Sequence, residues 1–138
     1  KLQLASVFAG MVQNHCVVGA THALAHQMSA FGLSHSDAIS IFLPLVIRRT
    51  IQNKDSNNRF EQLAIHSGFS KGSKLLKFVD DIISSFDLQK EKNIVLNNRE
   101  IILVDESFFE RALADKGGQG NPIPMDKEFL QDIMKKII

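Results

Sequence analysis

The most informative stretch of the sequence reads Gly19-Ala-Thr-His22-Ala-Leu-Ala-His26-Gln-Met-Ser-Ala-Phe31-Gly32-Leu-Ser34-His35. It carries three of the five histidines of the chain within fourteen residues. His22 and His26 stand four residues apart in an alanine-rich run without proline, which predicts a helix with both imidazoles on one face. Gly32 can end this helix, and Ser34 or Ser36 can cap the next one. The sequence therefore predicts a turn that brings His35 alongside the first histidine pair.

Three converging histidines suggest a metal site, because neutral imidazole is a common ligand of first-row metals and helices hold such ligands rigidly. An ordinary role is the competing interpretation, since histidines four residues apart are often surface or core residues with usual hydrogen-bond partners. A catalytic metal also needs at least three protein ligands, so a further carboxylate or histidine must contribute. Spacing alone leaves both interpretations open.

Composition excludes several classes of protein. The 138 residues are enough for one domain with a core, and 44% apolar and 22% charged residues are ordinary for a globular chain. The net charge of +1 and the scattered basic residues give no surface for nucleic acid or an anionic membrane. The apolar run 39–47 is far too short to span a bilayer. The single cysteine, Cys16, fits a reducing compartment, so we expect a cytoplasmic protein.

Hydrophobic periodicity predicts an all-α helical bundle in one domain, residues 1–138. The first expected helix, 2–12, is apolar on most faces and should therefore lie inside the bundle. Residues 52–58 are polar and read as a surface loop, whereas residues 94–104 read as a small β-hairpin turning at Asn97-Asn98. Asp105 is expected to cap the helix that follows it. The other helices are expected at 17–30, 37–50, 59–66, 74–86, 106–114 and 126–136.

Two groups of residues resemble the C-terminal helical domain of the iron-dependent (group III) alcohol dehydrogenases. The first is the apolar segment 5–18 followed by Gly19-Ala-Thr-His22-Ala-Leu-Ala-His26 and, further on, Ser34-His35-Ser with a Leu-Pro helix. The second is the ending Ala112-Leu-Ala-Asp115 with Asn121-Pro122. This resemblance implies a dehydroquinate-synthase-like helical domain. The chain departs from the family pattern where Ser34-His35-Ser36 replaces Pro-His-Gly, and where the His22 to His35 spacing is one residue shorter.

The resemblance also implies roles for the histidines. His22 and His35 match the family's ligands of a catalytic divalent metal, Fe2+ or Zn2+, and His26 matches a catalytic histidine close to substrate and nicotinamide. It implies an alcohol dehydrogenase or aldehyde reductase acting on a small alcohol or aldehyde with NAD or NADP. The nucleotide-binding domain and the family's two other metal ligands, an Asp and a His, are expected N-terminal to this sequence, so the 138 residues alone should be inactive. The resemblance leaves a homodimer open.

Two alternatives remain at this point. Dehydroquinate-synthase-like lyases and zinc glycerol dehydrogenases have related helical domains with a similarly placed histidine pair, although the ending at 112–122 favours the iron group. A non-catalytic helical interaction module, in which all three histidines are structural, belongs to a different class of function altogether.

Overall fold

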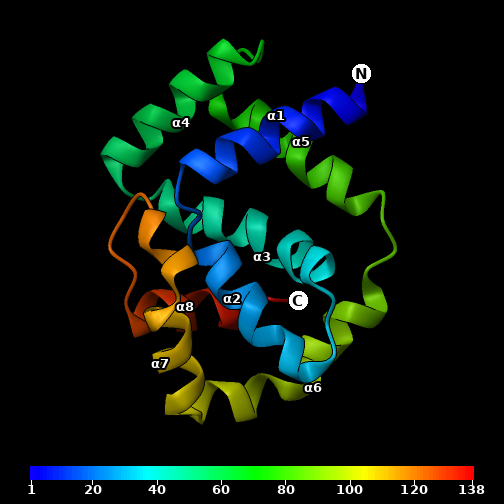
Figure 1. The fold of residues 1–138 in the computed structure, drawn as a ribbon, viewed down its shortest axis with the longest axis vertical. Coiled ribbons are helices and arrows are strands. Elements are labelled where there is room, and N and C mark those ends of the chain that lie inside the picture. Colours follow the sequence, from blue (N-terminus) through cyan, green and yellow to red (C-terminus); the bar gives the residue numbers. More distant parts are fainter.

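The computed structural model describes all residues, 1–138, and contains eight α-helices, two short 3-10 helices and no strand (Figure 1). The predicted all-α fold is therefore confirmed. Along the chain the elements are α1 (Leu2–His15), α2 (Ala20–Met28), η1 (Ser29–Phe31), α3 (His35–Thr50), α4 (Lys54–His66), α5 (Gly72–Ser84), α6 (Gln89–Val104), α7 (Glu106–Ala114), η2 (Lys116–Gly120) and α8 (Lys127–Lys135).

The hydrophobic core lies between α2, α3, α6, α7 and α8. Its largest fully buried side chains are aromatic or branched, and apolar area of this kind dominates the stability of a small domain. Helices α2 and α3 run through the middle of the molecule, with α7 and α8 on one side and α6 below (Figure 1). The fully buried large side chains include Phe42, Phe108, Phe109, Phe129, Leu24, Met28, Ile102 and Leu130.

The corner between α2 and α3 is made as the sequence predicts. Gly32 has a φ of +84°, which a residue with a side chain adopts only at a cost. Ser34 is the N-cap of α3, and its hydroxyl oxygen accepts a hydrogen bond from the Asp37 N–H at 3.2 Å. Helix α3 then continues through Pro44 to Thr50. His35 consequently occupies the first position of a stable helix.

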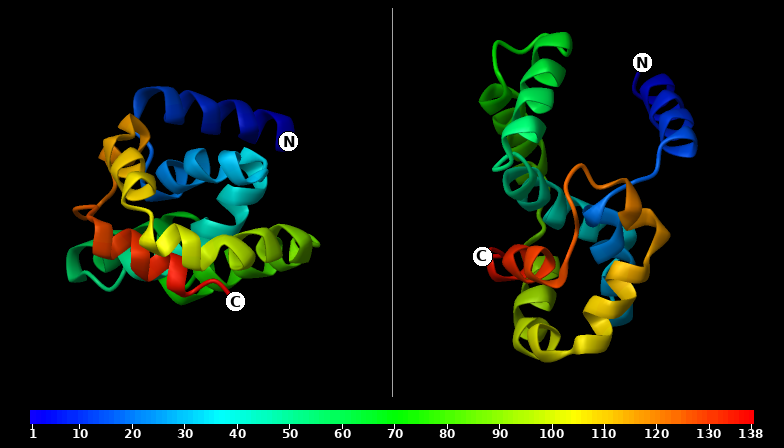
Figure 2. Two further views of the ribbon diagram at one scale, coloured as in Figure 1. Left: turned by 90° about the horizontal axis from the view of Figure 1, so that it is seen from below. Right: turned by 90° about the vertical axis from the view of Figure 1, so that its left-hand side faces the viewer.

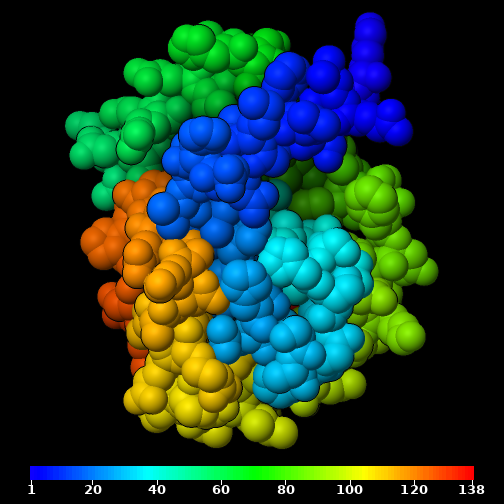
Figure 3. All heavy atoms as spheres, in the orientation of Figure 1, coloured from blue at the N-terminus to red at the C-terminus, as the bar shows by residue number.

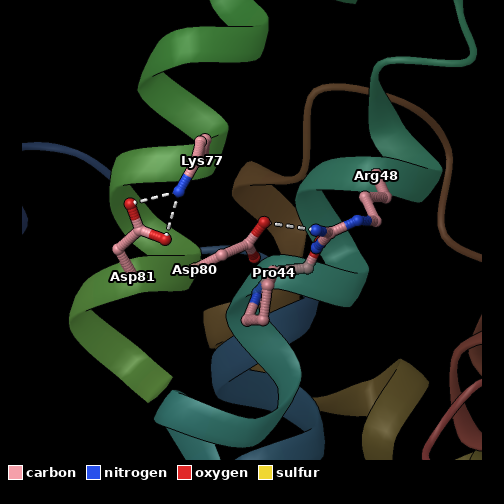
Figure 4. A network of polar contacts seen from close by, with 5 residues as sticks. All are labelled: Pro44, Arg48, Lys77, Asp80 and Asp81. Atoms are coloured by element: carbon pink, nitrogen blue, oxygen red, sulfur yellow. Dashed lines mark hydrogen bonds and ion pairs between the residues drawn. The ribbon is translucent and has the colours of Figure 1, made fainter. Parts of the chain in front are cut away.

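Helices α4 and α5 form a pair at one end of the molecule. The predicted loop 52–58 is wrong over most of its length, because Asn53 caps α4 by accepting hydrogen bonds from the Asp55 and Ser56 N–H groups, both at 3.1 Å. Polar residues that favour loops also favour helix N-termini, which explains the error. Figure 4 shows how Arg48 of α3 reaches Asp80 of α5, while Lys77 and Asp81 pair within α5.

The predicted β-hairpin at 94–104 is also wrong, because these residues form most of α6. Val95 and Ile102 are seven residues apart, lie on one helix face and are fully buried. The Asn98 side-chain amide donates to the Ile94 carbonyl at 2.8 Å instead of forming a turn. Burial against the core outweighs β-branched propensity here, since an isolated two-stranded ribbon would be marginal.

Helix α1 corrects another expectation, because it lies outside the bundle. Every one of its residues is exposed, including Leu4, Phe8 and Met11. Seen from the side, α1 stands apart from the other helices (Figure 2). The apolar surface that predicted burial is present, but no other helix of these 138 residues packs against it. None of the eight α-helices combines the length and the apolar character that crossing a membrane requires.

Candidate metal and catalytic site

Three histidine side chains come together where α2 meets the start of α3. His22 and His26 lie on one face of α2, and His35 begins α3. The ring centre of His35 is 5.2 Å from that of His22 and 5.1 Å from that of His26, and the His22 and His26 ring centres are 6.2 Å apart. The convergence expected from the sequence is therefore found, despite the shorter turn.

The three rings differ in their surroundings. His22 is half-buried, whereas His26 and His35 are exposed. The pKa of the His22 imidazole is lowered, first because burial disfavours its charged form, and then because charge on His35 and on His26 would repel it. The carboxylate of Asp115 opposes this effect without reversing it. His22 is therefore neutral at physiological pH, which is the protonation state that a metal ligand needs.

His26 has a partner that the sequence did not reveal. Its Nδ1 lies 2.7 Å from a carboxylate oxygen, Oδ2 of Asp115, at the end of α7. The second oxygen of Asp115, Oδ1, accepts a hydrogen bond from the Gly117 N–H at 2.7 Å. Because each of its oxygens is hydrogen-bonded and its side chain is only 17% exposed, the Asp115 carboxylate is held in place by the protein. Of the three histidines, only His26 is hydrogen-bonded to this carboxylate.

The segment η2 holds α2 at both ends. Asp115, which precedes η2, binds His26 in the last turn of α2, while Asn121, which follows η2, accepts a hydrogen bond from the Ala20 N–H at 3.2 Å in the first turn. Segment η2 and helix α2 lie side by side in Figure 3. At Gly120, η2 also comes very close to the residues just before α2, because an added Cβ would lie 2.2 Å from the carbonyl oxygen of Val17. Glycine is required here because any side chain would collide with backbone.

The histidines suit a metal as part of a larger ligand set. Imidazole nitrogen binds such metals at about 2.0–2.1 Å, which puts the ring centres of two imidazoles on one cation about 5 Å apart. The His22 and His35 ring centres, at 5.2 Å, match this separation. No three His, Cys, Asp or Glu side chains of the chain are grouped so that they could hold a metal ion by themselves. His22 and His35 therefore fit as two ligands, and any others would have to come from outside these residues.

A well-formed pocket lies elsewhere in the molecule. A pocket of about 430 Å³ lies beside the first turn of α2, bordered by the end of α3, by α4 and by Asn121-Pro122. None of the three histidines lines it. We take the histidine cluster as the candidate site, because it combines converging ligand groups with a carboxylate partner, whereas this pocket has mostly apolar walls.

Comparison with known proteins gives this site a context. The family model for the C-terminal part of Fe-containing alcohol dehydrogenases matches residues 1–138. The chain belongs to the Fe-containing alcohol dehydrogenase family. The family resemblance seen in the sequence is thus confirmed along the whole chain.

Two relatives illustrate the relationship. The first is alcohol dehydrogenase 4 of Saccharomyces cerevisiae, which is 31% identical over 136 residues that cover 96% of this chain and 35% of the yeast protein. The second is 1-propanol dehydrogenase PduQ of Salmonella typhimurium, which is 26% identical over an alignment of 148 residues that covers the whole chain and 40% of that protein. The chain thus spans between a third and two fifths of the length of these curated relatives. No solved structure matches it significantly.

The sequence points to the three histidines but not to Asp115 and Asn121, the two residues that hold α2. In the sequence these two residues stand out only as part of a family-like ending. Their contacts with His26 and Ala20 span 89 and 101 residues along the chain. No local pattern reveals pairs so distant, and the only signal was that this Gly-rich segment carries an aspartate and an asparagine at its two ends.

Proposed function

We propose that this chain is the metal-binding, catalytic part of an NAD(P)-linked alcohol dehydrogenase or aldehyde reductase. The observation that carries the proposal is the cluster of His22, His26 and His35 in a chain that belongs throughout to the Fe-containing alcohol dehydrogenase family. The substrate is a small alcohol or aldehyde. The nicotinamide cofactor is bound mainly by a nucleotide-binding domain outside these residues, and it carries the hydride.

His22 and His35 are proposed to bind the metal, Fe2+ or Zn2+, together with ligands from outside these 138 residues. When bound, the metal supplies Lewis-acid chemistry to the alcohol oxygen. His22 suits this role because its pKa is lowered, chiefly by burial, which keeps the ring neutral. His35 suits it because the first turn of a capped helix holds its ring in one place.

His26 is proposed to handle the proton that leaves the alcohol or returns to the aldehyde. It is the most tightly hydrogen-bonded of the three histidines, through Asp115, and its ring is exposed enough to meet a substrate. Imidazole is the usual group for proton transfer near neutral pH, because its ordinary pKa lies close to neutrality. The 138-residue chain alone is expected to bind metal weakly and to be inactive, since it provides only part of the ligand set.

The test uses the full-length protein that carries this chain. After removal of metal by a chelator and reloading with Fe2+ or Zn2+, we expect the protein to oxidise 1-propanol with NAD or NADP. The reaction is measured by the absorbance of the reduced nicotinamide. His22→Ala and His35→Ala should each lower the bound metal, measured by elemental analysis, and abolish turnover. His26→Ala should keep the metal and lose turnover about 10²- to 10⁴-fold.

His66→Ala is the matched control, because His66 is a histidine at the exposed end of α4, far along the chain from the cluster, with its Nδ1 on the Gln62 carbonyl. It should change neither metal content nor turnover. Retention of full metal and full activity by His22→Ala would overturn the proposal and favour a structural role for the three histidines.

A further inference from the structure

The contact between His26 and Asp115 determines which nitrogen of the imidazole carries the proton. An ionised carboxylate only accepts hydrogen bonds, so the His26 Nδ1, 2.7 Å from Asp115 Oδ2, must be the donor. In the neutral ring the other nitrogen, Nε2, then bears the lone pair. No other hydrogen-bonding group of the protein contacts the His26 ring nitrogens. Asp115 therefore leaves His26 with one free, proton-accepting nitrogen.

Asp115 can hold the ring only because its own position is fixed. Its Oδ1 accepts from the Gly117 N–H at 2.7 Å, which makes it the N-cap of η2. The far end of η2 is held beside the start of α2 by a hydrogen bond of 3.0 Å from the Gly120 N–H to the carbonyl of Val18, just before the helix, and by the bond from the Ala20 N–H to Asn121. The carboxylate, the histidine and the helix that carries the histidine are thus connected as one rigid unit.

We propose that Asp115 is a positioning residue that fixes the tautomer and the orientation of the His26 imidazole. The inference rests on the proposed function insofar as it assigns His26 to proton transfer in alcohol oxidation. A carboxylate on the far nitrogen of a functional histidine both orients the ring and strengthens the basicity of the near nitrogen. Loss of such a partner changes the rate of the chemical step more than the binding of substrate.

The chain offers a matched control in Asp105, the N-cap of α7. Both aspartates are caps that accept a hydrogen bond from the N–H two residues later, at 2.9 Å for Asp105 and 2.7 Å for Asp115. They differ in their second oxygen, because Asp105 Oδ2 lies 3.9 Å from Arg111 and contacts no histidine. The same substitution at both sites therefore distinguishes the effect of weakening a helix cap from the effect of losing the contact with His26.

The experiment compares Asp115→Asn with Asp105→Asn in the full-length protein. In Asp115→Asn the amide oxygen is needed by the Gly117 N–H, so the amide nitrogen turns toward His26 and can only donate. We expect the His26 proton to move from Nδ1 to Nε2. This is read from nitrogen chemical shifts of 15N-histidine protein, loaded with diamagnetic Zn2+, at about pH 8.5, where ordinary imidazole is neutral. A His26→Gln variant assigns the signals.

Kinetics give the second measurement. Asp115→Asn should lower kcat for 1-propanol by about ten- to a hundredfold, with KM changed less than about threefold. Asp105→Asn should change neither the nitrogen shifts of His26 nor kcat. Asp115→Ser is a second variant, because serine still caps η2 but is too short to reach His26. It should lose the Nδ1 proton preference and reproduce the fall in kcat.

Unchanged His26 shifts in Asp115→Asn, or an equal loss of kcat in Asp105→Asn, would overturn the inference. Failure of both Asp115 variants to fold, while Asp105→Asn folds, would also overturn it in favour of a purely structural role. If the unaltered protein oxidises no alcohol, the proposed function fails, but the nitrogen shifts still decide whether Asp115 sets the His26 tautomer.

Discussion

Helices α1 and α2 are neighbours in the sequence and both are rich in apolar residues, yet their surroundings are opposite. No residue of α1 is buried, whereas six of the nine residues of α2 are. Helix α2 packs against α3, α7 and η2, and α1 has no comparable partner within the chain. The difference shows that apolar composition predicts a tendency to be buried, and that partners from elsewhere in the sequence decide whether burial occurs.

The largest expected effect comes from truncating a leucine in each helix. Leu24 of α2 is fully buried, so Leu24→Ala should lower the free energy of unfolding by about 2–5 kcal/mol through lost burial and a cavity. Leu4 of α1 is 58% exposed, so Leu4→Ala should change it by less than about 0.5 kcal/mol. Urea unfolding of the 138-residue chain measures both. Equal losses would contradict the exposed position of α1.

A glycine pair tests the same contrast from the opposite direction. Gly120→Ala adds a Cβ only 2.2 Å from the Val17 carbonyl oxygen, and the backbone displacement should cost about 1–3 kcal/mol. Gly10 of α1 has no atom within 4 Å of an added Cβ. Gly10→Ala should therefore stabilise the helix, by up to about 1 kcal/mol, because alanine has the higher helix propensity. Circular dichroism and urea unfolding give both values. A stable Gly120→Ala protein would mean that η2 does not hold α2.

The smallest effect is expected at an asparagine pair. Asn121→Ala removes the acceptor of the Ala20 N–H and should cost about 1 kcal/mol, as other lost N-terminal caps do. Asn121→Asp keeps an acceptor oxygen but loses the amide nitrogen that donates to the Ile123 carbonyl at 2.9 Å, so it should restore only part of this loss. Asn14 is exposed in α1, where alanine is the better helix former, so Asn14→Ala should cost nothing. The urea midpoints rank the three variants, and a loss for Asn14→Ala as large as for Asn121→Ala would refute the special role of Asn121.

Much of the fold could be predicted from local sequence, because most helices are indicated by the periodicity of their apolar residues and by their capping residues. The helix after Asp105 runs over Glu106–Ala114 as expected, with the Asp105 carboxylate accepting from the Ser107 N–H. The loop expected at 52–58 fails for a local reason, because polar residues also favour helix N-termini, whereas the β-hairpin expected at 94–104 fails because of tertiary context. Residues 94–104 have local β propensity, but Val95 and Ile102 gain more by burial on the face of α6.

The candidate site likewise contains residues that local sequence predicts and one that it does not. The three histidines could be predicted because their convergence depends on local features, namely a four-residue spacing and a turn at Gly32 with a cap at Ser34. Asp115 could not, because it reaches His26 through the packing of η2 against α2, and that packing depends on how the whole chain folds. Local rules specify which groups a helix presents, and only the tertiary structure specifies what each group meets.

The glycine-rich segment that follows α7 has a consequence for the order in which the protein matures. During synthesis His26 leaves the ribosome 89 residues before its partner Asp115, and Ala20 leaves it 101 residues before Asn121. Since domains fold as units during synthesis, a nascent chain that ends before Asp115 holds every imidazole of the cluster without the geometry to use it. The histidine cluster is thus completed only after the glycine-rich segment has been synthesised and has packed beside α2.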